Sequence, residues 1–140
     1  MAERRNKYGA KPVYYAGRRF DSKGEGQRFL FLNSCLQAGK IKDLRMQVPF
    51  ELYPAVYQMR IGARGKPVRG QQLQHGITYT ADFVYTLPDG TVVVEDFKGY
   101  ETPEFLIKER LMHEMRGITL YKPKRPCAPL GGSGNENQTI

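Results

Sequence analysis

The chain has 140 residues, 40% of them hydrophobic, which predicts one domain with a modest core. Its formal net charge of +8 and isoelectric point near 9.6 indicate a polyanionic partner, and nucleic acid fits this better than a membrane does. No segment has the apolar length that crosses a bilayer, and the first residues lack the apolar core of an export signal. Two widely separated cysteines, Cys35 and Cys127, favour free thiols in a reducing cytoplasm.

Residues 1–19 are predicted to form a basic N-terminal arm in which cations are interleaved with tyrosines. Flexible basic arms bind phosphate backbones, and tyrosine can stack on exposed bases. A merely soluble, partly disordered tail fits the same composition equally well. The candidate nucleic-acid contacts in this arm are Arg4, Arg5, Lys7, Lys11, Arg18 and Arg19.

A helix is predicted from residue 21 or 22 to about residue 38. Phe29, Leu32 and Leu36 recur at helical spacing, and Gly39 supplies the C-terminal stop.

The start of this helix allows two interpretations of Glu25. Ser22 and Glu25 have the spacing of a capping box, in which the glutamate side chain reaches back to the backbone of the cap. Alternatively, Glu25 turns toward the rest of the domain and completes an acidic cluster. Gly24 and Gly26 each weaken a helix by about 1 kcal/mol relative to alanine, which indicates that another segment approaches the backbone closely.

Residues 41–53 are predicted to form one strand or two, with a kink at Pro49 that favours an edge position or a bulge. Residues 58–76 show no regular pattern and are predicted to be a mobile basic loop that grips nucleic acid, with pure disorder as the alternative. The candidate contacts in this loop are Arg60, Arg64, Lys66 and Arg69.

The hairpin predicted at residues 79–99 carries the most informative pattern. Runs of β-branched and aromatic residues flank a Pro-Asp-Gly turn, the first strand carries Asp82, and the second ends in Asp96 and Lys98 on one face. Two carboxylates and an amine that converge in this way can hold Mg²⁺ and position water for phosphodiester hydrolysis. For an isolated pattern of this kind, an ordinary surface ion pair is the alternative.

A second helix is predicted to begin with Thr102 as its N-cap and Pro103 at its first position, and to end at Gly117. Residues 118–121 are predicted to form a short last strand, parallel to the second hairpin strand. Residues 122–140 have the composition of a flexible C-terminal tail. The helix residues expected to face the sheet are Leu111, Met115 and either Phe105 or Ile107.

The predicted fold class is α/β, with a mixed central sheet flanked by helices in the order αβββαβ and a domain that covers residues 20–121. This order, with its helical acid and acidic hairpin, resembles the PD-(D/E)XK nuclease superfamily and its restriction-endonuclease-like core. The similarity covers roughly residues 7–121 and is strongest to a small phage-encoded family of unknown function. It extends to phage Holliday junction resolvases of the endonuclease I type. The motifs that carry it are Phe20-Asp21-Ser22-Lys23-x-Glu25, Tyr79-x-Ala81-Asp82-Phe83 and Val94-Glu95-Asp96-x-Lys98-Gly99.

The resemblance implies that Glu25, Asp82 and Asp96 bind Mg²⁺ or Mn²⁺ and that Lys98 positions the attacking water. Glu95 is the ambiguous neighbour, because strand alternation turns it away unless a bulge intervenes. The implied activity is metal-dependent, structure-selective cleavage of Holliday junctions or other branched DNA, and paired cuts favour a homodimer. A non-catalytic nucleic-acid-binding module in phage recombination or replication is the alternative that composition alone supports equally well.

Overall fold

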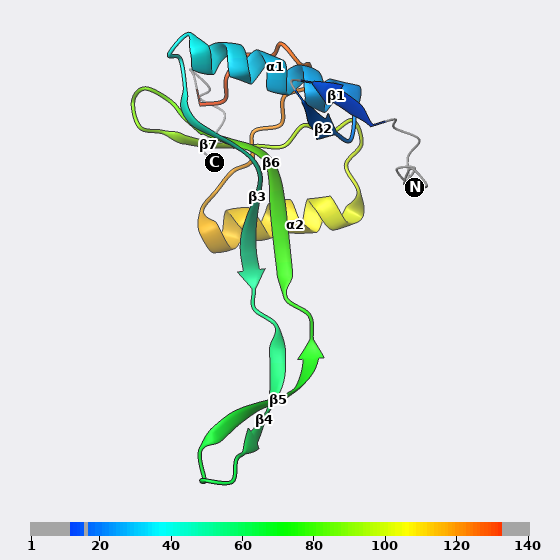
Figure 1. Ribbon diagram of the computed structural model, residues 1–140, viewed down its shortest axis with the longest axis vertical. Coiled ribbons are helices and arrows are strands. Elements are labelled where there is room, and N and C mark those ends of the chain that lie inside the picture. Colours follow the sequence, from blue (N-terminus) through cyan, green and yellow to red (C-terminus); the bar gives the residue numbers. More distant parts are fainter. Residues whose placement is uncertain (1–11, 16, 133–140) are drawn as a thin grey trace.

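A three-stranded sheet with one helix on each face carries a long two-stranded ribbon in the computed structural model, which describes residues 12–15 and 17–132 (Figure 1). The predicted α/β class is confirmed. The elements are β1 (Val13–Tyr15), β2 (Arg18–Phe20), α1 (Lys23–Gln37), β3 (Lys42–Tyr53), β4 (Val56–Ile61), β5 (Pro67–Gln74), β6 (Ile77–Thr86), β7 (Val92–Glu95) and α2 (Pro103–Arg116).

The three strands of the central sheet pair antiparallel in the order β3-β6-β7, so the mixed sheet predicted from the sequence is limited, among the described residues, to one isolated parallel bridge. The predicted hairpin is confirmed as β6 and β7, in which Phe83 pairs with Glu95 and Gly90 adopts a positive φ of 92° in the turn. Strand β3 lies at the edge, where the missing N–H of Pro49 breaks no ladder between two neighbours. The predicted edge position is therefore confirmed.

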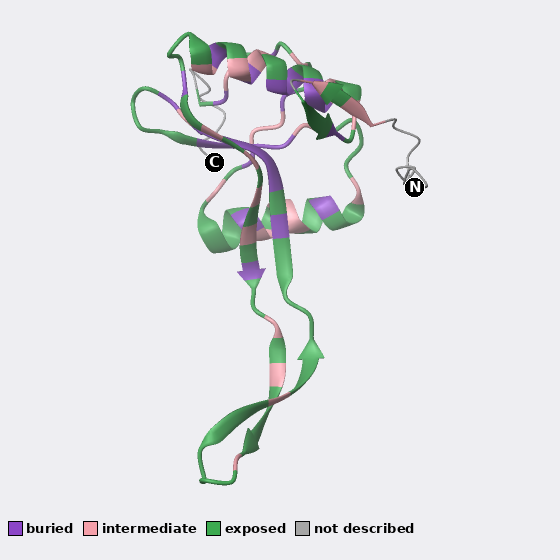
Figure 2. Cartoon of the chain, viewed as in Figure 1, coloured by how far each residue is buried: buried purple, intermediate pink, exposed green. Residues whose placement is uncertain are grey.

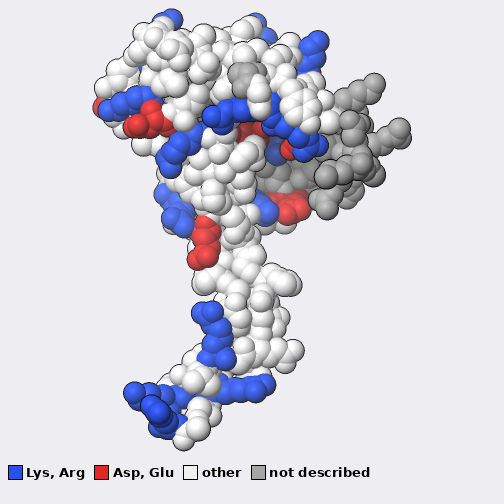
Figure 3. Space-filling view, in the orientation of Figure 1, with Lys and Arg blue, Asp and Glu red and all other residues white. Residues whose placement is uncertain are grey.

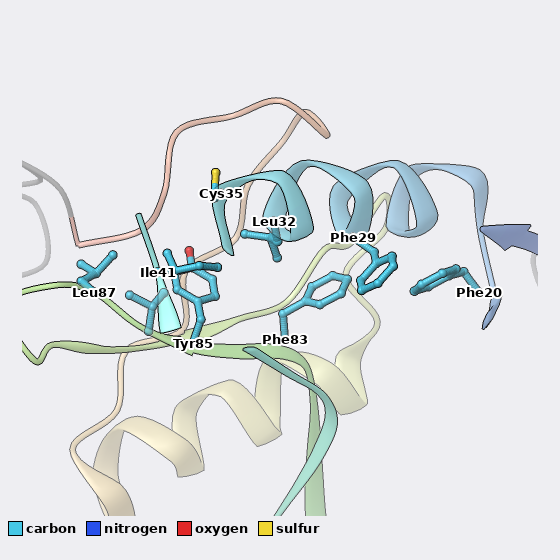
Figure 4. Close-up of a cluster of buried hydrophobic side chains, with 9 residues drawn as sticks. Phe20, Phe29, Leu32, Cys35, Ile41, Phe83, Tyr85 and Leu87 are labelled. Atoms are coloured by element: carbon cyan, nitrogen blue, oxygen red, sulfur yellow. The ribbon is translucent and has the colours of Figure 1, made fainter. Parts of the chain in front are cut away.

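Each face of the sheet carries its own apolar cluster. On one face, Phe29 and Leu32 of α1 pack against Phe83 and Tyr85 of β6 (Figure 4). On the other face, Phe105 and Met112 of α2 pack in a second cluster, which also contains Leu52, Tyr79, Ala81, Val84, Val94 and Leu120. The sequence thus builds two layers of core around one sheet, which matches the expected arrangement.

The strand pair β3–β6 changes faces at one point along its length. Ala81 and Phe83 are two residues apart and would share a face of a regular strand, yet they belong to opposite clusters. Their partners Val48 and Met46 are divided in the same way. The residue between these partners, Gln47, has a positive φ of 51°, which bends β3 at this point.

Helix α2 begins and ends where the sequence predicts. The Thr102 hydroxyl accepts a hydrogen bond from the Phe105 N–H, and Gly117 caps the other end in the left-handed conformation. The predicted inward face is only partly right, because Met115 is 42% exposed and Met112 is buried instead. Phe105 and Met112 lie seven residues apart, or nearly two full turns, so they define the buried stripe and leave Met115 at its margin.

The predicted last strand is reduced to a single parallel bridge. Glu95 pairs with Tyr121, whose N–H donates to the Val94 carbonyl and whose carbonyl accepts from the Asp96 N–H, each at 2.9 Å. The parallel direction is as predicted, but residues 118–120 do not join the sheet. Because β7 ends at Glu95, the hairpin offers little edge for a longer strand to pair with.

The prediction of an irregular loop at residues 58–76 is wrong. Strands β4 and β5 pair antiparallel into a ribbon that extends away from the body, and most of its residues are exposed (Figures 1 and 2). Its turn is closed by hydrogen bonds between Gly62 and Lys66 and between Gly62 and Gly65. The Gly, Arg and Lys content suggested irregularity, whereas Val56, Tyr57 and other β-formers on both sides of the turn favour pairing.

The predicted flexible ends are shorter than expected. Residues 13–15 and 18–20 form strands β1 and β2, which pair with each other and pack against α1, so the arm does not extend to residue 19. Part of the predicted tail also packs on the core: Ala128 is buried, and the Gly131 N–H donates to the Tyr85 hydroxyl. The composition of residues 122–132 predicted a loose tail, because hydrogen bonds to side chains far away in the sequence leave no pattern among neighbouring residues. Arg4, Arg5, Lys7, Lys11 and residues 133–140 lie outside the described residues.

Candidate active site

The first turn of α1 directs the Glu25 carboxylate toward the sheet. The Ser22 hydroxyl caps the helix by accepting a hydrogen bond from the Glu25 N–H at 3.2 Å. The Glu25 carboxylate accepts a hydrogen bond from the amide of Gln47 on β3 at 3.1 Å. The backbone of Glu25 thus serves the cap, while its side chain is available to the acidic cluster.

The two glycines beside Glu25 allow close packing, as predicted. A Cβ on Gly24 would lie 2.5 Å from the ring of Phe97, and one on Gly26 would overlap the ring of Tyr15. The contact at Gly24 brings the segment after β7 against the start of α1. This contact places the chain that carries Asp96 and Lys98 beside Glu25.

Asp82 lies on β6, opposite the bend in β3 and beside the chain that follows β7. One of its carboxylate oxygens accepts a hydrogen bond from the Phe97 N–H at 2.8 Å, and the other accepts from the Gln47 amide at 3.4 Å. Gln47 therefore bridges Asp82 and Glu25 with one side-chain nitrogen. The sequence marks Gln47 as the start of a stretch shared with the family it resembles, from Gln47 through Pro49 to Leu52, but assigns it no role in the site, because that role depends on the left-handed bend in β3.

Asp96 and Lys98 lie on the same side of the chain, as strand alternation predicts. The Lys98 amine is 3.5 Å from one oxygen of Asp96 and is 37% exposed, whereas Asp96 is buried. The Tyr79 hydroxyl donates a hydrogen bond of 2.5 Å to the other oxygen of Asp96. Burial and the Asp96 charge together raise the pKa of Tyr79, so it stays a donor and holds Asp96 in place.

Burial and crowding make the acidic cluster hold protons tightly. Burial, reinforced by the charges of Asp96 and Glu25, raises the pKa of Asp82 to about 8. Burial, together with the charges of Asp21 and Asp96, raises the pKa of Glu25 to about 7, against the opposing effect of Lys98. A bound cation would offset the negative charge that crowds these carboxylates.

The cluster meets the minimum requirement for a Mg²⁺ ion. Among the described residues, one oxygen of Asp96 is buried without a hydrogen-bond partner, and it is the oxygen that lies 3.5 Å from the Lys98 amine. No three His, Cys, Asp or Glu side chains in this part of the chain converge as a ready-made metal cage. Mg²⁺ commonly takes one or two carboxylates plus waters and substrate phosphate, so Asp82 and Asp96 suffice as protein ligands.

Glu95 points away from this cluster, as alternation predicts. It is fully buried and forms an ion pair of 2.5 Å with Arg28 of α1, and it accepts a hydrogen bond of 2.8 Å from the Tyr85 hydroxyl. Arg28 also donates to the Ala128 and Pro129 carbonyls. Glu95 thus anchors the helix and the chain after residue 122, and it is not part of the candidate site.

A cleft of about 810 Å³ opens beside the acidic cluster, with Glu25 and Gln47 in its lining. Arg18 and Arg19 of β2 and Arg45 of β3 line the same cleft, and the Arg18 guanidinium lies 5.8 Å above the Phe29 ring. The structure thus brings two of the predicted nucleic-acid contacts into one cleft with Glu25, whereas Asp82, Asp96 and Lys98 are not part of its lining. Arg45 was missed, because in a strand read by its apolar alternation it counted only as a polar spacer.

The other described candidates lie apart from the cluster. Arg60 and Arg69 lie on the strands of the ribbon, and Arg64 and Lys66 lie at its turn. All four belong to the exposed ribbon and none lines the cleft. The predicted contacts therefore fall into two groups, one beside the acids and one at a distance from them.

Comparison with known proteins gives one match. The family DUF1064, described as a protein of unknown function, matches residues 5–123 and so spans Glu25, Asp82, Asp96 and Lys98. No curated protein and no solved structure matches the chain. Neither described helix is long and apolar enough to cross a membrane.

Proposed function

We propose that this chain, which belongs to the DUF1064 family, is a metal-dependent DNA endonuclease that cuts branched or junction DNA. The observation that supports it best is the linkage of the three acids: Gln47 bridges Glu25 and Asp82, and the Asp96 charge raises the pKa of both. The Lys98 amine lies 3.5 Å from Asp96. Buried carboxylates with raised pKa values beside a cleft are typical of a functional site. The resemblance to PD-(D/E)XK nucleases leads to the same assignment.

In the proposed mechanism, Asp82 and Asp96 would hold the cation, and Tyr79 keeps Asp96 oriented through its short hydrogen bond. A bound Mg²⁺ or Mn²⁺ would polarise the phosphoryl oxygens and stabilise negative charge on the leaving oxygen. Glu25 would complete the cation site, and Gln47 holds it to Asp82. Lys98 is exposed enough to contact the phosphate and helps to position the water that attacks the phosphorus.

The substrate strand is proposed to run through the cleft beside Glu25. Arg18, Arg19 and Arg45 line this cleft and are placed to contact the phosphates that flank the scissile bond. Phosphate contacts carry no base sequence, so the enzyme would select DNA by shape. Free thiols at Cys35 and Cys127 suit the reducing cytoplasm in which such an enzyme would act.

A non-catalytic nucleic-acid-binding module is the second candidate. It explains the charge of +8, but it gives no reason to bury carboxylates next to a phosphate path. The two candidates differ in turnover, so one assay separates them.

The test is incubation of the full chain with labelled four-way junction, linear duplex and single strand, in Mg²⁺, Mn²⁺ or EDTA. We expect cleavage of the junction with either metal and none in EDTA. The Asp82→Asn variant, prepared in parallel, controls for contaminating nucleases. Binding of all three substrates without any cleavage would instead support the non-catalytic module.

A further inference from the structure

Every charged side chain of the ribbon formed by β4, β5 and their turn is a cation. The sequence has no Asp or Glu between Glu51 and Asp82, and it has four Lys or Arg residues there. Figure 3 shows Lys and Arg gathered at the far end of the ribbon, with acidic side chains only on the body in that view. An exposed rod of one charge sign attracts a polyanion and repels a second copy of itself.

The cations are distributed over both faces of the ribbon. Met59 pairs with Arg69 and Arg60 pairs with Val68, so alternation turns Arg60 and Arg69 to opposite faces. The Arg69 guanidinium lies 4.2 Å above the ring of Tyr57. On the other face, a Cβ on Gly70 would lie 3.0 Å from Arg60 Nε, so the glycine lets Arg60 lie across the ribbon.

A ribbon with cations on both faces can contact two rows of phosphates when it lies between them, whereas only one of its faces can contact a single row. The major groove of duplex DNA has such walls and admits a two-stranded β-ribbon. Single-stranded nucleic acid offers one phosphate row and is bound by stacking on exposed aromatic side chains. On the ribbon, Tyr57 is half-buried and its ring is already covered by Arg69.

The ribbon also sets a distance from the acidic cluster. Thirteen positions separate Gln47 from Arg60, and thirteen separate Arg69 from Asp82. An extended strand rises about 3.3 Å per residue, so these arginines lie up to about 40 Å along the strands from the cluster. One turn of duplex DNA spans about 34–36 Å.

We propose that this ribbon lies in a groove of duplex DNA about one helical turn from the scissile phosphate. The inference rests on the proposed function for the position of the cut. It narrows the substrate to DNA whose duplex continues for about ten base pairs or more to one side of the cleaved bond. The ribbon would therefore select substrates by duplex length rather than by base sequence.

The test uses binding, so it does not depend on turnover. The full-length Asp82→Asn chain is titrated in EDTA against labelled duplexes of about 8 and about 20 base pairs, which are shorter and longer than one turn. The ribbon variant adds R60Q, R64Q, K66Q and R69Q. A matched control removes four cations from elsewhere, K40Q, K42Q, R110Q and K124Q, so that both variants carry the same net charge.

We expect the ribbon variant to lose about tenfold or more in affinity for the long duplex, with a smaller salt slope, while its affinity for the short duplex changes about as much as the control's. Hydroxyl-radical protection on a long junction arm should extend about one turn from the cut and shorten in the ribbon variant. Equal losses on both duplexes, or equal behaviour of the two variants, would overturn the inference. So would loss of self-association in the ribbon variant with DNA binding unchanged.

These outcomes are separable from failure of the proposed function. If the wild type never cleaves but the ribbon substitutions cause the length-dependent loss of binding, the endonuclease proposal fails and the ribbon inference stands. If junctions are cleaved but the ribbon variant binds both duplexes like the control, only the ribbon inference fails. All eight substituted side chains lie on the surface, so we expect both variants to fold. Thermal unfolding of each variant checks this.

Discussion

Asp82 is held in the candidate site by hydrogen bonds from two segments, β3 and the chain after β7. It accepts the Phe97 N–H, it touches Gln47, and it is 9% exposed in the middle of the cluster. A carboxylate in this environment is costly without a cation, because burial and neighbouring charges both oppose its ionisation.

Asp82→Asn should abolish cleavage and leave DNA binding unchanged or tighter. The substitution removes a cation ligand and a negative charge that faces the phosphate path. Single-turnover cleavage of a junction and a binding titration in EDTA measure the two effects. Wild-type cleavage by this variant with Mg²⁺ would show that the assigned site is wrong.

Gln47→Asn should reduce cleavage while preserving the fold. Asparagine tolerates the left-handed backbone at φ 51°, but its side chain is one carbon too short to bridge Glu25 and Asp82. The measurements are the cleavage rate and the thermal unfolding midpoint.

Glu25→Gln is the companion variant: it keeps the cap, whose acceptor is Ser22, so a large loss of cleavage would identify Glu25 as catalytic. Near-normal rates in both variants would restrict the site to Asp82, Asp96 and Lys98.

The free energy of unfolding should fall as the pH rises, whereas carboxylates in ion pairs usually make it rise. The pKa of Asp82 is about 8 in the folded chain against an ordinary 3.8, and that of Glu25 is about 7 against 4.5. The folded state therefore binds more protons, and the resulting stabilisation is complete below about pH 4 and lost as the pH rises through 7 and 8.

In EDTA, the thermal unfolding midpoint of the wild type should fall as the pH rises from about 5 to about 8.5. Asp82→Asn should flatten this dependence, because of the two carboxylates Asp82 has the larger rise in pKa. A flat profile in the wild type would contradict the crowding of the carboxylates.

At the scale of elements, the interior of α1 is tied to the sheet by a buried ion pair. Arg28 and Glu95 have no exposed side-chain surface, and Arg28 also binds the carbonyls of residues 126, 128 and 129. A helix, a strand end and the chain after α2 therefore meet at one guanidinium. The rings of Phe31 and Tyr121 lie 4.9 and 6.0 Å from it.

Arg28→Met should destabilise the fold by about 3–5 kcal/mol, because it leaves Glu95 buried without its counterion. Urea unfolding measures the loss. The double variant Arg28→Met with Glu95→Leu is the matched control and should recover part of it, since no unpaired charge remains. Equal destabilisation in the single and double variants would show that the carbonyl contacts, rather than the ion pair, carry the stability.

At the scale of the whole molecule, the described chain contains one acidic cluster of this kind, while resolution of a four-way junction needs two symmetric cuts. We therefore predict that the working unit is a homodimer, the commonest arrangement with two-fold symmetry. Sedimentation at micromolar protein, with and without junction bound to the Asp82→Asn chain, measures it. A monomer in both states, combined with paired incisions by the wild type, would exclude this prediction.

The sequence by itself determined what depends on neighbours along the chain. The caps at Ser22 and Thr102, the stop at Gly117 and the turn at Gly90 were all predictable, because each rests on the chemistry of a few adjacent residues. Alternation then predicted that Asp96 and Lys98 lie on one side of the chain and Glu95 on the other.

Only the tertiary structure decided the rest. Gln47 enters the site because β3 bends there, and Arg28 meets Glu95 across 67 residues of chain, so neither contact has a local signal. Residues 58–76 form a ribbon because β4 and β5 continue the direction of β3 and β6, whereas their composition suggested a loop. Burial, which raises the pKa of Asp82, likewise comes from packing, because adjacent residues cannot by themselves exclude water from a side chain.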